Sequence, residues 1–369
     1  MNEKRLGELR DRIRDIDEEI LKLTSERMTI CREVGLYKKD HNLPVKNYRV
    51  EKEILERTKE LAHKFGIMPE LAQRLMKDLI HYSVVEQEEI KSTKMSSVYS
   101  ESHRNVLVIG GGGNMGLWMS QFFETFGHQI KILDRNQQLS SRFEQVSDLA
   151  SGCDWADFIV IATPMKTAAD IIQDLVRLKP KATIIEICSL KSPIEQSIQT
   201  AKRQGLSLIS IHPMFGPDTK LLAGKNIVIC NDENPELVSM MRQIFSMTSA
   251  NIIEIPLSQH DPLMSYVLGS AHFINLVYAR LLKRSAISYS DLQKIAGTTF
   301  EKQMSVTSDV LLENQDLYFD IQSLNAETDA LIDDFVKASQ EMQSQIIENR
   351  RQEFKTQMAE SLKYLIDSE

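Results

Sequence analysis

Hydrophobic side chains recur at spacings of three and four through the first quarter of the chain, which is the period of amphipathic helices. The first stripe contains Leu6, Leu9, Ile13, Ile16, Ile20 and Leu23, and its register continues through Arg27, Ile30 and Val34. Two more helices are predicted, with apolar faces at 54–61 and 72–80. A stripe of about seven turns is too long to be covered by its own chain alone. We therefore expect it to pack against a second copy as well, which predicts a homodimer.

From residue 104 the pattern changes to short apolar runs that alternate with helix-length segments, which is typical of parallel strands joined by crossover helices. The runs lie at 106–109, 129–133, 158–162, 183–188, 206–211, 226–230 and 251–255. Beyond Pro262 the periodicity is helical nearly to the end. The sequence therefore predicts a multidomain protein. Its parts are an all-α domain at 1–91, a Ser-rich linker at 92–103, an α/β doubly wound sheet at 104–257 and an all-α domain at 258–369.

Composition excludes several classes of function. The net charge is −8, from 44 basic and 52 acidic residues, so no basic surface is expected to replace the counterions of a nucleic acid. The longest apolar stretch, 158–165, is far shorter than a membrane-spanning helix, and no apolar leader begins the chain. We expect a cytoplasmic protein that binds neither nucleic acid nor membranes. The cysteines at 31, 153, 188 and 230 are widely separated, which predicts buried thiols and no metal site.

Polar residues occupy several positions in the helical stripes of the first domain. Arg27 lies in the register of the first helix, Glu51 shares the apolar face of the second, and Ser83 and Gln87 extend the stripe of the third. One interpretation is that Arg27 and Glu51 pair in the core, while the other two lie at a wet helix end. We favour a pocket, because an unpaired buried charge costs several kcal/mol and a buried pair is seldom better than an apolar one.

Two more cations are expected beside this pocket. Arg10 and Lys38 lie near the same register of the first helix. Several cations and one carboxylate suit a small dianion with a polar substituent.

Residues 1–90 resemble the all-helical chorismate mutases, which are domain-swapped dimers. The matching residues are Leu9-Arg10, Glu26-Arg27, Glu33-Val34-Gly35, Lys38, Pro44-Val45, Glu51, Ser83 and Gln87. The resemblance implies the rearrangement of chorismate to prephenate. Arg27 and the partner's Arg10 would bind carboxylates, Lys38 and Gln87 would stabilise charge on the ether oxygen, and Glu51 would hold the C4 hydroxyl. Such a reaction needs positioning and electrostatics, and no nucleophile.

The C4 end of this pattern differs from the family. Val50 stands where relatives commonly have Arg, and Arg49 is rotated by about 100° from that position on a helix. Asn47, a candidate substrate-binding residue, replaces an Asp found in some relatives.

A glycine motif, Gly111-x-Gly113-x-x-Gly116, connects the first predicted strand to a helix. Asp134 follows Gly116 by 18 residues, at the end of the next strand. This context predicts a Rossmann-like dinucleotide site in which backbone approaches a pyrophosphate and Asp134 binds the ribose hydroxyls. Asp134 favours NAD, although the neighbouring Arg135 leaves NADP open. The expected cofactor-binding residues are Gly111, Gly113, Met115, Gly116, Asp134 and Thr163.

Ligands bind at the carboxyl ends of the strands in such a sheet, so polar residues there merit attention. Ser189 and Lys191 follow one strand and are candidates for substrate binding. His212 is expected directly after another strand, before a Pro- and Gly-rich turn. The near-neutral pKa of a free histidine would let His212 accept a proton as hydride leaves the adjacent carbon.

Residues 104–369 resemble the prephenate dehydrogenases, and the whole chain resembles the bifunctional T-proteins of tyrosine biosynthesis, in which a mutase precedes the dehydrogenase. The matching motifs are Val108-Ile-Gly-Gly-Gly-Gly-Asn-Met-Gly116, Ser189-x-Lys191 and His212-Pro-Met-Phe-Gly-Pro-Asp218. The resemblance implies that prephenate is oxidatively decarboxylated with NAD to 4-hydroxyphenylpyruvate. His212 would polarise the C4 hydroxyl. The last helical domain would bind substrate and form a dimer.

One substrate-binding cation of that family is missing. T-proteins have Arg directly before a His-Phe pair, where this chain has Ala271. Lys302 or Lys191 is a candidate replacement, and His260 is a further candidate for substrate binding.

Two other functions stay open at this point. The same reactions could act on 4-amino-4-deoxychorismate and 4-amino-4-deoxyprephenate, giving 4-aminophenylpyruvate. An ammonium at C4 would suit Glu51 and the absence of Arg at position 50. The third possibility is a non-catalytic, NAD-responsive regulator with a helical dimerisation arm.

Overall fold

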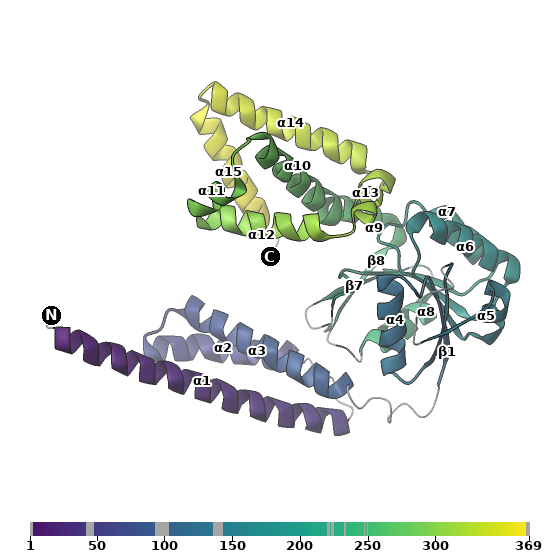
Figure 1. Ribbon diagram of the computed structural model, residues 1–369, viewed down its shortest axis with the longest axis horizontal. Helices are drawn as coiled ribbons and strands as arrows, with labels where there is room; N and C mark the ends of the chain where they lie inside the picture. Colours follow the sequence, from purple (N-terminus) through teal and green to yellow (C-terminus); the bar gives the residue numbers. More distant parts are fainter. Residues whose placement is uncertain are drawn as a thin grey trace. The chain divides into compact units, whose positions relative to one another are not determined.

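The computed structural model describes residues 3–41, 48–92, 103–135, 143–219, 222, 225–231, 234–246, 248 and 250–366 (Figure 1). Two compact units are present: Met1–Cys188 with Ser197–Pro256, and Ser189–Gln196 with Leu257–Glu369. Of the predicted linker, residues 93–102 lie outside the described residues.

Three helices form the N-terminal part, as predicted: α1 (Glu3–Asp40), α2 (Tyr48–Phe65) and α3 (Pro69–Ser92). α3 packs against both α1 and α2. The stripe of α1 is largely uncovered in the single chain, because this helix has 38 residues and α3 has only 24. Ile13, for example, is 58% exposed. Leu61 and Leu75, expected to face inward, are also exposed.

The central part is an eight-stranded sheet in the order β3-β2-β1-β4-β5-β6-β7-β8. All seven predicted strands are present: β1 (Asn105–Ile109), β2 (Gln129–Leu133), β4 (Phe158–Ile161), β5 (Thr183–Glu186), β6 (Leu208–Pro213), β7 (Asn226–Asn231) and β8 (Asn251–Pro256). The two-residue strand β3 (Glu144–Gln145) was too short to be seen in the pattern. β1 and β4 are buried almost completely, which explains their continuous apolar runs.

The expectation of parallel strands was wrong at one junction. β7 runs antiparallel to β6, and β8 is parallel to β7. An antiparallel neighbour can be reached without a crossover helix, and the described residues between Pro213 and Asn226 contain no helix. The described helices of the other connections are α4 (Asn114–Thr125), α5 (Leu149–Trp155), α6 (Met165–Leu178), α7 (Glu195–Arg203) and α8 (Pro235–Ser246).

The C-terminal unit is helical, as predicted. It contains α9 (Leu257–Met264), a π-helix (Ser265–Ser270), α10 (Ala271–Arg284), α11 (Tyr289–Lys294), α12 (Thr298–Leu312), α13 (Gln315–Leu324), α14 (Thr328–Ile347) and α15 (Arg351–Ile366). The segment Ser189–Gln196, which follows β5 in the chain, belongs to this unit. Among the helices of the described ranges, none is long and apolar enough to cross a membrane.

Candidate active sites

Four of the predicted mutase residues meet between α1 and α3. Arg27 donates from Nη1 to the carbonyl oxygen of Leu79 at 2.9 Å and to Ser83 Oγ at 2.5 Å. Lys38 Nζ donates to Gln87 Oε1 at 3.0 Å. Ser83 and Gln87 are buried, so the polar positions of the α3 stripe do point inward as expected.

Gly35 allows this close approach of α1 to α3. A Cβ atom at position 35 would lie 2.9 Å from Gln87 Cγ and 3.3 Å from Gln87 Cα. Because side chains three residues apart share one helix face, Gly35 and Lys38 both face Gln87. The glycine therefore determines how closely the two helices pack beside the Lys38–Gln87 hydrogen bond.

The other predicted residues of this site are not brought to the same cluster by the described part of the chain. Arg10 is exposed and precedes Arg27 by 17 residues, which is about 25 Å along a straight helix. Such a distance fits a role for Arg10 in the site of another chain, namely a second copy of this protein. Glu51 lies on α2, but its side chain is outside the described residues, and so is Asn47.

The glycine turn between β1 and α4 has the tight geometry that a dinucleotide site needs. A Cβ atom at Gly116 would lie 2.1 Å from the carbonyl oxygen of Gly110, and one at Gly111 would lie 2.5 Å from Ile132 Cβ. At Gly113, by contrast, the contact nearest to such an atom is the oxygen of Gly110 at 3.3 Å, and the residue is exposed. Gly113 therefore leaves space for a ligand at the N-terminus of α4, where backbone N–H groups favour phosphate.

Asp134 and Thr163 lie at the ends of the strands on either side of β1. Asp134 Oδ2 accepts a hydrogen bond from the backbone N–H of Gly112 at 2.9 Å, which joins the carboxylate to the turn. The hydroxyl of Thr163 is buried and has no hydrogen-bond partner within the described ranges. Met115 is half-buried beside Gly116. A cradle that admits only glycine and a buried unsatisfied hydroxyl both fit a bound dinucleotide.

His212 lies inside β6 and is not the first residue after it, which corrects the sequence expectation. It is buried and pairs with Val228 of β7. The strand is longer than its apolar run because the antiparallel partner β7 continues the ladder to Pro213. His212 still belongs to the carboxyl end of the strand.

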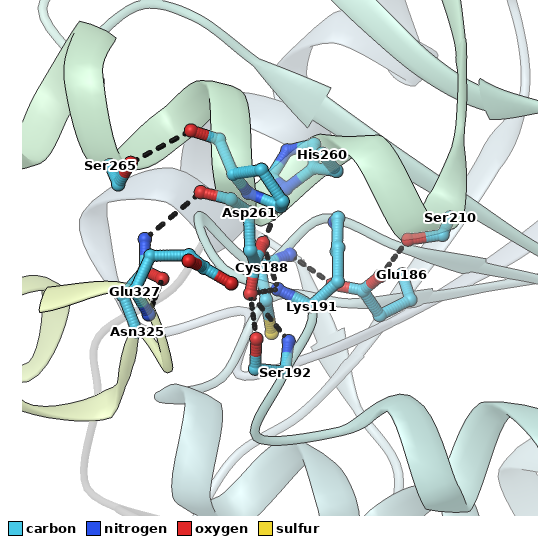
Figure 2. A network of polar contacts seen from close by, with 11 residues as sticks. Glu186, Cys188, Lys191, Ser192, Ser210, His260, Asp261, Ser265, Asn325 and Glu327 are labelled. Atoms are coloured by element: carbon cyan, nitrogen blue, oxygen red, sulfur yellow. Dashed lines mark hydrogen bonds and ion pairs between the residues drawn. The ribbon is translucent and has the colours of Figure 1, made fainter. Parts of the chain in front are cut away.

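A buried carboxylate that the sequence did not single out lies close in register to His212. Glu186, the last residue of β5, accepts a hydrogen bond from Ser210 Oγ at 2.5 Å and another from the backbone N–H of Cys188 (Figure 2). Ser210 precedes His212 by two residues and so lies on the same face of β6. The sequence signal that could have identified Glu186 is an acidic residue at the carboxyl end of a buried strand.

A second buried carboxylate, Asp261 of α9, organises the polar groups of the C-terminal unit. Its oxygens accept hydrogen bonds from the backbone N–H groups of Lys191 and Ser192, from Ser192 Oγ and from His260 Nδ1. Burial raises the pKa of Asp261, but the hydrogen bonds from His260, Ser192 and Lys191 lower it, leaving it at about 2. The carboxylate is therefore ionised at neutral pH.

The candidate substrate residues of this unit separate into two sets. Lys191 and His260 are buried and are linked through Asp261, and Ser189 lies two residues before Lys191. Lys302 is exposed on α12, and no described contact links it to that network.

The position of the missing arginine is followed by a neutral histidine. Ala271 begins α10 directly after the π-helix, and His272 stacks on Tyr318 with ring centroids 4.0 Å apart. Burial lowers the pKa of His272 to about 4, and its Nδ1 has no hydrogen-bond partner in the described part of the chain. At neutral pH, positions 271 and 272 therefore supply no cation.

Family models match all three parts of the chain. Residues 9–88 match chorismate mutase type II, residues 125–254 match the nucleotide-binding domain of prephenate dehydrogenase, and residues 256–360 match its dimerization domain. The chain belongs to the chorismate mutase and prephenate dehydrogenase families. It is therefore a bifunctional enzyme of tyrosine biosynthesis, with isomerase and oxidoreductase activities. The dehydrogenase half binds a nucleotide cofactor. The glycine turn precedes the matched range, so its role rests on its geometry.

Two relatives named T-protein match most of the chain. The chain is 24% identical to a T-protein of Haemophilus influenzae over 356 residues. This aligned region covers 95% of this chain and 89% of that protein. A T-protein of Enterobacter agglomerans is 23% identical over 316 residues, 86% of this chain and 81% of its own length.

Solved structures support the fold of the dehydrogenase half. The prephenate dehydrogenase from A. aeolicus in complex with hydroxyphenyl propionate and NAD+ has a TM-score of 0.60 at 18% identity, covering 73% of this chain and 100% of that one. Synechocystis arogenate dehydrogenase has a TM-score of 0.53 at 19% identity, covering 67% and 93%.

Proposed function

We propose that the N-terminal helices rearrange chorismate to prephenate and that the rest of the chain oxidises prephenate with NAD to 4-hydroxyphenylpyruvate and CO2. The observation that supports this most directly is the fusion itself. The product of the first family's reaction is the substrate of the second. Membership of two enzyme families gives no support to a non-catalytic regulator.

In the mutase half, Arg27 and Lys38 supply the positive charge that a dianionic substrate requires, and contacts between α1 and α3 hold them in place. Arg27, held by Leu79 and Ser83, would bind a carboxylate of chorismate. Lys38 and Gln87 would stabilise the charge that develops on the ether oxygen. Glu51 would hold the C4 substituent, and the partner's Arg10 would complete the site of a homodimer. Fixed charges of this kind lower the barrier without a covalent step.

In the dehydrogenase half, bound NAD supplies the acceptor for the hydride that leaves C4. His212 accepts the proton of the C4 hydroxyl. The C–C bond to the ring carboxylate breaks, CO2 leaves, and its bonding electrons complete the aromatic ring. The proton returns to the phenolic oxygen of the product, so the atoms and charges balance. The paired backbone of β6 and β7 fixes the direction of the His212 side chain.

The first test separates the two halves. In His212→Asn, we expect NADH formation from prephenate to fall by about 1,000-fold, because the variant lacks the proton acceptor. Chorismate consumption, measured by its absorbance, should stay near that of the wild type. Loss of both activities in a folded His212→Asn protein would contradict the two-site assignment.

Substrates with an amino group at C4 are the second candidate. The observation that favours them is Val50, which stands where relatives commonly have Arg and so leaves no cation there to repel an ammonium at C4. The comparison is kcat/KM for prephenate against 4-amino-4-deoxyprephenate. A preference above about 100-fold in either direction, roughly 2.7 kcal/mol of transition-state binding, decides between them.

A further inference from the structure

The segment that follows β5 is held by hydrogen bonds that end on a single carboxylate. Lys191 donates its backbone N–H to both oxygens of Asp261, at 2.9 and 3.0 Å. Ser192 donates its backbone N–H at 2.6 Å, and its hydroxyl donates to the same carboxylate (Figure 2). Consecutive backbone donors that converge on one acceptor fix the dihedral angles between them, so the orientation of this turn depends on Asp261.

The same carboxylate also fixes a histidine. His260 is fully buried, and its Nδ1 lies 2.6 Å from Asp261 Oδ1. Since an ionised carboxylate can only accept, Nδ1 must be the donor. In the neutral ring, Nε2 is then the acceptor, as in sites where a carboxylate selects the tautomer of a histidine.

Asp261 is itself held rigidly. Asn325 donates from Nδ2 to the backbone oxygen of Asp261 at 3.1 Å, and its Oδ1 accepts the N–H of Glu327 at 3.0 Å. The junction between α13 and α14 is thereby joined to α9. Because Asp261 and Asn325 are both 5% exposed, solvent does not compete for these hydrogen bonds.

We propose that Asp261 is a positioning residue of the dehydrogenase site, which orients Ser189, Lys191 and His260 for the substrate without contacting the substrate itself. This inference rests on the proposed function and on the sequence prediction that those three residues bind its substrate. An acid is required at position 261 because an amide has one acceptor oxygen and would present its NH2 group to the donors of Lys191 and Ser192.

The test compares Asp261→Asn with Thr307→Val. Thr307 is a buried residue of the same unit, and its hydroxyl donates to Asn275 Oδ1 at 2.7 Å, away from the turn. Thr307→Val therefore controls for the loss of a buried hydrogen bond. We expect Asp261→Asn to lower kcat/KM for prephenate by about 100-fold, which is the cost of misplaced binding groups. The loss should appear mainly in KM for prephenate, while KM for NAD and the mutase activity stay near wild type.

Amide hydrogen exchange tests the hydrogen bonds independently of turnover. The amides of Lys191 and Ser192 should exchange faster in Asp261→Asn than in the wild type. In Thr307→Val their exchange rates should equal those of the wild type. Ser192→Ala should have an intermediate effect on KM, and adding it to Asp261→Asn should cost nothing more, because both changes remove the same contact. Equal kinetic losses in Asp261→Asn and Thr307→Val, or unchanged exchange at the turn, would overturn the proposal. If the wild type does not turn over prephenate but the exchange rates change as expected, the proposed substrate is wrong, while the role of Asp261 in positioning the turn is still supported.

Discussion

Gly113 directly precedes α4 and Gly116 lies in the first turn of that helix, and the two glycines have different surroundings. A Cβ atom at Gly116 has no space, since it would overlap the backbone of Gly110 and Gly111. Gly113 has an ordinary extended backbone conformation, with φ of −77°, and is open on its exposed side. One glycine thus lets α4 approach β1, and the other leaves space that we assign to the pyrophosphate. The sequence motif alone does not distinguish these two roles.

The pair gives a prediction at the scale of single residues. Gly116→Ala should lower both the melting temperature and the affinity for NAD, because α4 must move away from the turn. Gly113→Ala should leave the melting temperature within about 2 °C, as for a surface change, and still weaken NAD binding by at least about 10-fold. Calorimetric unfolding and NAD titration measure the two effects. Normal NAD affinity in Gly113→Ala would show that the pyrophosphate does not bind beside Gly113.

At the scale of elements, the contact of α1 with α3 combines a close approach with polar pairs. Arg32 and Glu86 form an ion pair across the two helices at 2.5 Å, one turn from Ser83 along α3. The apolar period of the sequence predicted both helices and the inward direction of Arg27, Ser83 and Gln87. It did not predict their partners, because the choice of partner depends on how the two helices are rotated against each other.

Gly35 provides a test of this contact. Gly35→Ala should displace Gln87 and lower the mutase kcat/KM by about 10-fold, since small misplacements of binding groups are costly. The dehydrogenase activity should be unaffected. Gly7→Ala on the same helix is the matched control, because a Cβ atom there has no neighbour within 4 Å. That control should stabilise α1 by up to about 1 kcal/mol. Equal mutase activity in the two variants would show that the approach at Gly35 does not position Gln87.

At the scale of the whole molecule, the exposed stripe of α1 and the distance of Arg10 from Arg27 point to a second copy. Leu6, Leu9 and Ile13 lie on the same part of α1 as Arg10 and are uncovered in one chain. A symmetric dimer would bury this stripe and place two composite sites in it. In each site, Arg27, Lys38 and Gln87 would come from one chain and Arg10 from the other.

Mixing inactive variants tests this composition. Arg10→Ala and Arg27→Ala, unfolded and refolded together in equal amounts, should recover about one quarter of the wild-type mutase activity. Half of the dimers are then mixed, and each mixed dimer has one intact site. Arg27→Ala with Gln87→Ala is the control that should recover none, since both residues belong to the same chain's half of a site. Recovery in the control, or none in the first mixture, would exclude the composite site.

The sequence by itself determined the helical and strand periods and the glycine turn, and it predicted Arg27, Lys38, Ser83, Gln87 and His212 as site residues. These features follow from local rules: the repeat of each element, the conformational freedom of glycine and the position of a residue at a strand end. Only the tertiary structure decided the reversed direction of β7, the acceptor role of Glu186 and the network of hydrogen bonds on Asp261. Each of these joins segments that are far apart in the chain, and a hydrogen bond between such segments leaves no period in the sequence.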